Sequence, residues 1–264
     1  MHKPYRIRIR QPARRRWAFL LLVAGALCLY IASFSGKSSR MTIEPSGGVL
    51  VTREQSLPEQ CFYAVSLFSS PELLCAQTEA ARYASRGAAG VVLAQNGLYH
   101  SVGAIFPAQE SAERHAAALH AAEGIDAQVV ALPLSPVLLR VTATQRQLDA
   151  LLQAEALGRQ AALRLGEIAL RIDSGAIDLA GAQSLLDELH GQLAQAGEAL
   201  AQKSIGGGEP VCERLAALLQ EAAQKAERLS GLESPARLLF SSAVRALQAE
   251  LFMQMSAWRA QLGA

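Results

Sequence analysis

Histidines and carboxylates are the side chains that could support metal or acid–base chemistry here, but their spacing argues against both. His115 and His120 lie five residues apart, which is not the i, i+4 spacing of two ligands on one helix face, and no His-Glu-x-x-His motif occurs. Asp187 and Glu188 are neighbours on a polar helix surface, whereas glycoside hydrolysis needs two carboxyl groups flanking a sugar cleft. Because nucleophile-elbow and phosphate-loop motifs are also missing, the sequence predicts no catalytic residue, no metal site and no cofactor.

The elements that would position binding residues lie in the stretch 61–132, which alternates between strand and helix signals. Its first strand is rich in β-forming residues and ends where Ser70 can cap a helix and Pro71 can occupy the first helical position. Asn96-Gly97 indicates a tight hairpin turn. The expected elements are a strand at 62–68, a helix at 71–85, strands at 91–94 and 98–106, a helix at 109–123 and a strand at 128–132.

This order is a repeat of two strand–helix–strand halves. Two such halves predict a ferredoxin-like α+β unit, in which a four-stranded antiparallel sheet carries both helices on one face. The other face of the sheet is expected to be open. Alternation along the first strand places Phe62, Ala64 and Ser66 on one face. The more apolar set, Tyr63, Val65 and Leu67, should face the helices.

The same stretch resembles the SPOR (sporulation-related repeat) domain family, over about a quarter of the chain. The resemblance lies in aromatic-bracketed first and third strands, an Ala-rich second helix and glycines at the middle and before the last strand. The matching residues are Tyr63, Val65, Phe68, Ala80, Gly90, Tyr99, Gly103, Phe106, Ala112, Gly124 and Val129. The chain departs from the family at Ala64 and Ser101, and residues 103–106 read Gly-Ala-Ile-Phe where Gly-Pro-Phe is common.

The resemblance implies binding of septal peptidoglycan, in particular of glycan strands stripped of stem peptides. Sugar rings stack on aromatic side chains, and their hydroxyl groups need hydrogen-bonding partners. The candidate glycan-binding residues on the open face are therefore Phe62, Ser66, Tyr99 and Ser101. A one-residue slip of the third strand would exchange its two faces. The alternative is that Phe62 and Tyr99 only cover a sheet edge.

The N-terminus predicts a membrane anchor. Residues 1–16 carry seven Lys and Arg side chains and no acid, and 17–34 is an uncharged apolar run just long enough to cross a hydrocarbon core of about 30 Å. The basic cluster would keep the tail 1–16 in the cytoplasm, and everything after the span would lie outside the bacterial cytoplasmic membrane. A cleaved signal peptide is the alternative. The Ser-, Gly- and Pro-containing segment 35–60 is expected to be a flexible linker.

Charge outside this tail is slightly acidic. The chain has 25 Lys and Arg against 23 Asp and Glu, so removing the seven basic residues of the tail leaves 18 against 23. Nucleic-acid binding needs clustered positive charge, so the sequence predicts no nucleic-acid partner.

The segment 144–264 predicts a separate all-α domain beyond the SPOR-like domain at 61–140. Leu and Ala recur at helical spacing and Gly, Ser and Pro mark the breaks, which predicts a helical bundle. The expected helices are 144–172, 178–203, 210–230 and 235–262. The last helix carries an apolar stripe that can form bundle core, or can bind a protein partner or a second copy of the chain. Glycines inside these helices either weaken them or permit close packing.

These observations together predict a single-pass membrane protein that binds cell-wall glycan without catalysis at a division or sporulation septum. The alternative is a protein-interaction scaffold at the membrane whose SPOR-like domain no longer binds glycan. A wall hydrolase is a third, weaker interpretation.

Overall fold

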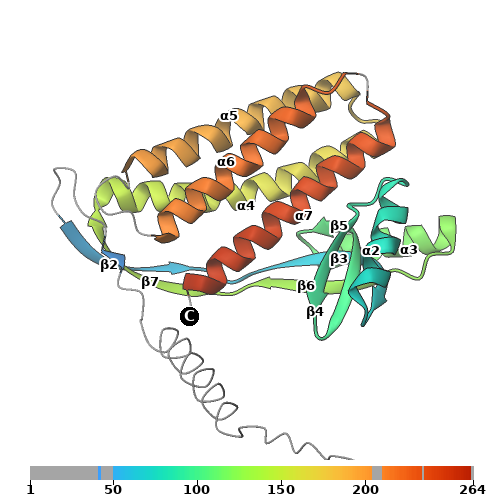
Figure 1. Cartoon of the computed structure of the whole chain (residues 1–264), viewed down its shortest axis with the longest axis horizontal. Coiled ribbons are helices and arrows are strands. Elements are labelled where there is room, and N and C mark those ends of the chain that lie inside the picture. The colour runs from blue at the N-terminus through green and yellow to red at the C-terminus, as the bar shows by residue number, and fades with distance from the viewer. Residues whose placement is uncertain (1–40, 43–49, 204–209, 234, 263–264) are drawn as a thin grey trace, which may run out of the picture. The chain divides into compact units, whose positions relative to one another are not determined.

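The computed structural model describes residues 41–42, 50–203, 210–233 and 235–262. Residues Met41–Ala264 form one compact unit, so the segments 61–140 and 144–264, expected as separate domains, lie together in it (Figure 1). The strands are β1 (Met41–Thr42), β2 (Leu50–Leu57), β3 (Gln60–Ser70), β4 (Val91–Gln95), β5 (Leu98–Phe106), β6 (Gln128–Leu134) and β7 (Val137–Thr144). The helices are α2 (Leu73–Ala84), α3 (Gln109–Glu123), α4 (Gln145–Ser174), α5 (Leu179–Lys203), α6 (Pro210–Ser230) and α7 (Arg237–Leu262).

The four-stranded sheet has the order β4–β5–β3–β6, and all its neighbours pair antiparallel. Helices α2 and α3 pack on one face of it. The side chains of Val65 and Leu67 are buried there with Phe106, Ala112 and Ala116. The prediction that the Tyr63, Val65 and Leu67 set faces the helices is confirmed. Small alanines let both helices lie close to the strands, which explains the Ala-rich pattern of this stretch.

The pairing of β3 with β5 contains an irregularity that changes which side chains share a face. Val65 pairs with Ala104, but the next pair is Ser66 with Val102, and the one after is Phe68 with Ser101. Gly103 on β5 and Leu67 on β3 are thus both left out of the pairing, and a Cβ atom at Gly103 would lie 3.0 Å from Cγ of Leu67. Because side chains alternate along a strand, one extra residue reverses the faces of the residues that precede it.

A second sheet with the order β1–β7–β2 replaces part of the expected linker. β2 and β7 pair antiparallel from Leu50 opposite Thr144 to Leu57 opposite Val137. They continue β3 and β6 as a long ribbon past the four-stranded sheet (Figure 1). Residues of β7 alternate between buried and less buried, which is the period-2 pattern of a half-covered strand.

Helices α4–α7 confirm the expected helical ranges to within two residues. Helix α4 begins with a capping box, in which the Thr144 side chain and that of Gln147 satisfy each other's backbone N–H groups. The apolar stripes of helices α4–α7 pack together with β7 and form the largest core cluster among the described residues. Of the glycines inside these helices, Gly158 and Gly166 lie where an added Cβ would clash with α7, at Met255 and Gln248 respectively, so they permit close packing.

Helix α7 covers the sheet face that the sequence predicted to be open. The rings of Phe252 on α7 and Phe62 on β3 meet edge to face with centroids 4.8 Å apart. Three α7 side chains spaced three residues apart donate hydrogen bonds to backbone carbonyls of the sheet unit. They are Ser242 to Ala88 (2.6 Å), Arg245 to Gly87 (2.6 Å) and Gln248 to Ile105 (3.0 Å). The helix is therefore fixed to this face by both apolar and polar contacts.

The fold class predicted from the sequence was wrong as a whole, although the α+β class holds. The four-stranded sheet is not a free-standing module followed by an independent bundle, because α7 and Leu163 of α4 belong to its core. Among the helices of the described ranges, none combines the length and apolar character needed to cross a membrane. The expected span 17–34 and the basic tail lie outside the described residues.

Candidate binding surface

The prediction that Phe62 and Ser66 line an open face was wrong. Phe62 lies on the face opposite α2 and α3, as expected, but it is only 1% exposed because α7 covers that face. Ser66 is only 2% exposed. The Ser66 hydroxyl is already used within the protein, since it donates to the carbonyl of Phe68 at 3.0 Å and contacts Nδ1 of His100 at 3.3 Å. The alternative, that Phe62 covers a sheet edge, was also wrong, because β3 is an internal strand.

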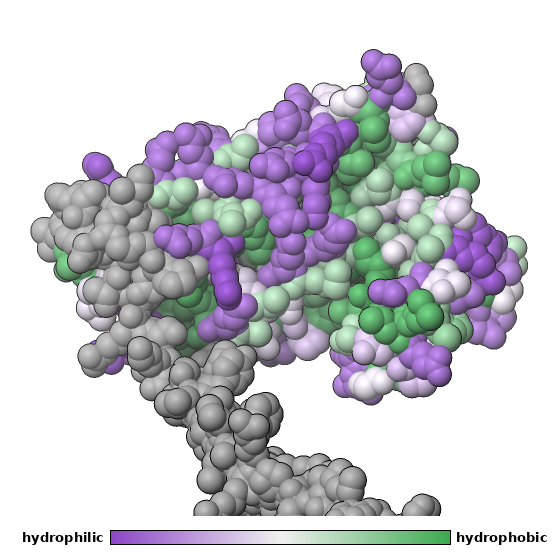
Figure 2. All heavy atoms as spheres, in the orientation of Figure 1, coloured by the Kyte–Doolittle hydropathy of each residue, from purple (hydrophilic) through white to green (hydrophobic). Residues whose placement is uncertain are grey.

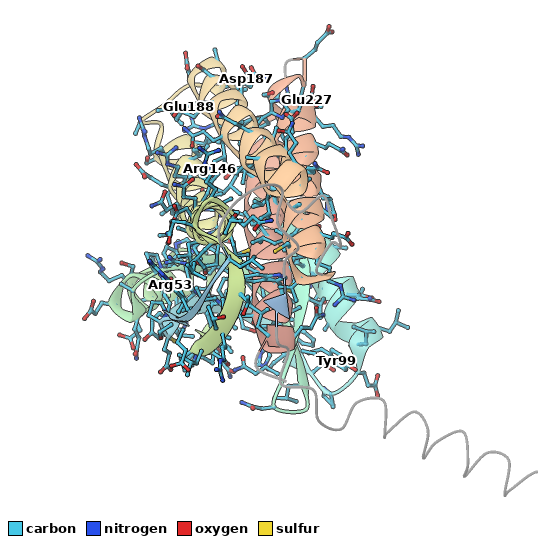
Figure 3. All side chains as sticks on the ribbon, turned by 90° about the vertical axis from the view of Figure 1, so that its left-hand side faces the viewer. Arg53, Tyr99, Arg146, Asp187, Glu188 and Glu227 are labelled. Atoms are coloured by element: carbon cyan, nitrogen blue, oxygen red, sulfur yellow. The ribbon has the colours of Figure 1, made fainter. Side chains whose placement is uncertain are left out.

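Ser101 and Tyr99 do not lie beside Phe62 and Ser66 on a shared surface. The extra residue Gly103 turns Ser101 toward α2, where its hydroxyl donates to the carbonyl of Ala76 at 2.7 Å and is buried. Tyr99 is half-buried at the end of β5, beside the β4–β5 hairpin and away from the labelled charged residues (Figure 3). The four predicted residues therefore form no common surface.

The buried charges of the molecule have a structural role. Glu155 on α4 accepts hydrogen bonds from Arg159 at 2.9 and 3.1 Å and from Nε of Arg259 at 3.1 Å. Arg259 on α7 also donates to the carbonyls of Pro58 at 2.9 Å and Ser135 at 3.5 Å, the two points at which the ribbon passes from one sheet to the other. This cluster holds both bends of the ribbon against α4 and α7.

Asp187 and Glu188 lie exposed on α5, at the end of the molecule away from Tyr99 (Figure 3). Glu188 lies 3.7 Å from Arg164 and accepts a hydrogen bond from Gln192. Over the described ranges, no three His, Cys, Asp or Glu side chains are placed to hold a metal ion.

A hollow between α3 and α4 forms a groove, which we call the α3–α4 groove. It has a volume of about 670 Å³ and a mainly apolar lining. One wall comes from α3, the other from α4, and the floor from the end of β5 and Gln248 of α7. The lining residues are Ile105, Phe106, Pro107, Ser111, Arg114, His115, Ala118, Leu163, Arg164, Gly166, Glu167, Leu170 and Gln248. Figure 2 shows that the visible parts of α5 and α6 are mainly hydrophilic.

A smaller cavity of about 170 Å³ adjoins the groove, and His115 lines both. In this cavity Arg245 of α7 forms an ion pair with Asp173 of α4, and Arg86 forms one with Glu123 of α3. Burial lowers the pKa of His115 below its ordinary value, the positive charge of Arg245 lowers it further, and Asp173 acts in the opposite direction. His115 is therefore neutral near pH 7 and packs against the ring of Phe106, with centroids 5.2 Å apart.

The geometry supports binding, since an apolar groove with a few polar groups on its rim is the usual form of a recognition site. Sequence reasoning missed the groove because its walls belong to two segments that were assigned to different domains. Ala118 and Leu163 are each ordinary members of a helix pattern, and only the tertiary arrangement brings them together.

Comparison of the chain with family models, with curated proteins and with solved structures found no match. The resemblance to the SPOR family therefore stays a prediction from the residues quoted for it.

Proposed function

We propose that this protein is a non-catalytic protein-interaction scaffold that binds a partner protein through the α3–α4 groove. The observation that carries the proposal is the position of α7. Helix α7 buries the sheet face on which glycan recognition was predicted. The α3–α4 groove, in contrast, has a mainly apolar lining that is open to solvent.

Glycan recognition has less support from the geometry. A sugar ring needs an accessible aromatic face on which to stack. Of the four predicted residues only Tyr99 is partly exposed, and it stands alone (Figure 3). The hydroxyls of Ser66 and Ser101 already have partners within the protein, so a sugar would have to displace them.

Sedimentation with purified cell-wall sacculi separates the two functions. The full chain is incubated with intact sacculi and with sacculi whose stem peptides have been removed by an amidase, and a protein known to bind denuded glycan serves as the positive control. We expect the chain to remain in the supernatant in both cases. Retention that rises after amidase treatment and is lost in Tyr99→Ala would contradict the scaffold and restore glycan binding.

Photo-crosslinking supplies the positive arm of the same test. A photoreactive side chain at Leu170, which lines the groove, is compared with one at Leu138, which is exposed on β7 outside it. In the cells that express the chain, crosslinked adducts should form from position 170. The crosslinked partner should be a protein, so protease treatment should remove it. Equal yields from the two positions would show that the groove is not the contact surface.

A further inference from the structure

The α3–α4 groove has the features of a site for a helix. Its walls are themselves helices, its lining is mainly apolar, and its volume of about 670 Å³ exceeds what a few side chains need. Leu170 on the α4 wall is 39% exposed, so an apolar surface continues from the floor to the rim. An amphipathic helix binds such a groove by placing side chains at i, i+3, i+4 and i+7 on the floor.

Charge on the rim selects the polar face of that helix. Arg114 on the α3 wall donates to the carbonyl of Glu110 and to the hydroxyl of Ser111, and within the described ranges it has no carboxylate within 4 Å. Arg164 on the α4 wall is half-exposed, forms an ion pair with Glu188 at 3.7 Å and donates a hydrogen bond to Gln192 at 2.9 Å. The one carboxylate of the lining, Glu167, lies 3.9 Å from Arg171. The lining thus contains two arginines and one glutamate, and its excess positive charge lies at Arg114, which has no ion pair within the described ranges.

From these two observations we infer that the partner presents an acidic amphipathic helix to the α3–α4 groove. Its apolar side chains contact Leu163, Leu170 and Ala118, and its carboxylates face Arg114 and Arg164 from the two walls. A basic helix would bring like charges together on the rim, which costs affinity and slows association. This inference rests on the proposed scaffold function and names the chemistry of its partner.

Fluorescence anisotropy with two designed peptides tests the inference on the full chain. One peptide carries leucines at i, i+3, i+4 and i+7 with glutamates on its other face, and the second carries lysines in place of the glutamates. We expect the acidic peptide to bind at least about 10-fold more tightly. Leu170→Glu should weaken its binding by about 10-fold or more, and Arg114→Glu should weaken it while strengthening binding of the lysine peptide.

Leu138→Glu is the matched control, because it places the same charge on an exposed leucine outside the groove. Equal binding of both peptides, or equal effects of the variants at 170 and 138, would overturn the acidic-helix inference. If the acidic peptide fails to bind while sacculi also fail to retain the chain, the inference falls and the scaffold proposal stands. Retention on sacculi removes the scaffold proposal itself. Thermal unfolding of each variant is the control that tests whether its fold is intact.

Discussion

The two faces of the four-stranded sheet are covered by elements of different origin. On one face lie α2 and α3, which connect the strands of the sheet and pack through small residues such as Ala76 and Ala112. On the other lies α7, which begins at Arg237, far along the chain from the last strand, and adds hydrogen bonds to its apolar contacts. A cover that is local in sequence is visible in the residue pattern, whereas a distant cover is visible only in the fold.

Removing the aromatic contact on the α7 face should have the largest effect. Phe252→Ala deletes the ring that packs on Phe62, and truncation of a buried Phe costs about 3–5 kcal/mol of unfolding free energy. Leu239→Ala on the same helix, where the side chain is more than half exposed, should cost less than about 0.5 kcal/mol. Urea denaturation measures both. Similar costs for the two variants would mean that α7 does not cover this face.

Replacing the buried carboxylate that holds the ribbon bends should have the second largest effect on the unfolding free energy. Glu155→Gln leaves the buried Arg259 without its counter-charge, which should lower the unfolding free energy by about 3 kcal/mol. Glu188→Gln removes an exposed partner of Arg164 and should cost less than about 1 kcal/mol. If both variants cost the same, the Glu155 cluster is not buried as described.

Alanine substitutions at two glycines allow a packed helix position to be compared with an unpacked one. A Cβ at Gly166 would lie 2.4 Å from Nε2 of Gln248, so Gly166→Ala should break the bond from Gln248 to the Ile105 carbonyl and destabilise by about 1–3 kcal/mol. Nothing lies within 4 Å of a Cβ at Gly191 on α5, so Gly191→Ala should stabilise by up to about 1 kcal/mol. Thermal melts give the sign of each change, and a stabilising Gly166→Ala would argue against close contact of α4 with α7.

The smallest effect is the pH dependence that His115 contributes. Because burial and Arg245 lower its pKa in the folded state, the unfolded chain takes up a proton more readily than the folded one. The contribution of His115 to the folding stability is complete above the ordinary histidine pKa of about 6.5, and it is lost as the pH falls below that value. His115→Asn should therefore lose less stability between pH 7 and pH 5 than the native chain does. Parallel pH profiles for the two proteins would contradict this.

Much of the local structure could be predicted from the sequence. The Asn96-Gly97 turn and the leucine spacing of the C-terminal helices each depend on neighbours within a few residues. The expected cap at Ser70 with Pro71 as the first helical residue was wrong, because β3 runs to Ser70 and α2 begins at Leu73 with Glu72 as its N-cap. The strands and helices from 62 to 132 lie close to their expected bounds for the same reason. The sequence pattern does not predict β7, although Val137–Thr144 alternates, because the prolines before it indicate the end of the domain.

The glycan-binding face predicted from the sequence failed for two physical reasons. An extra residue at Gly103 exchanges the faces of β5, and strand alternation alone does not reveal it. A phenylalanine such as Phe62 also has the same residue pattern whether it faces solvent, a sugar or another helix. Its partner, Phe252, lies in the stripe that was interpreted as core of a separate bundle.

Contacts between the rings of Phe62 and Phe252 test the covered face most directly. In the full chain labelled at phenylalanine, nuclear Overhauser spectra should show cross-peaks between these two rings, which lie edge to face at 4.8 Å between centroids, and the peaks should vanish in Phe252→Ala. A Phe62 ring without cross-peaks to α7 and broadened by a water-soluble paramagnetic probe would contradict the account.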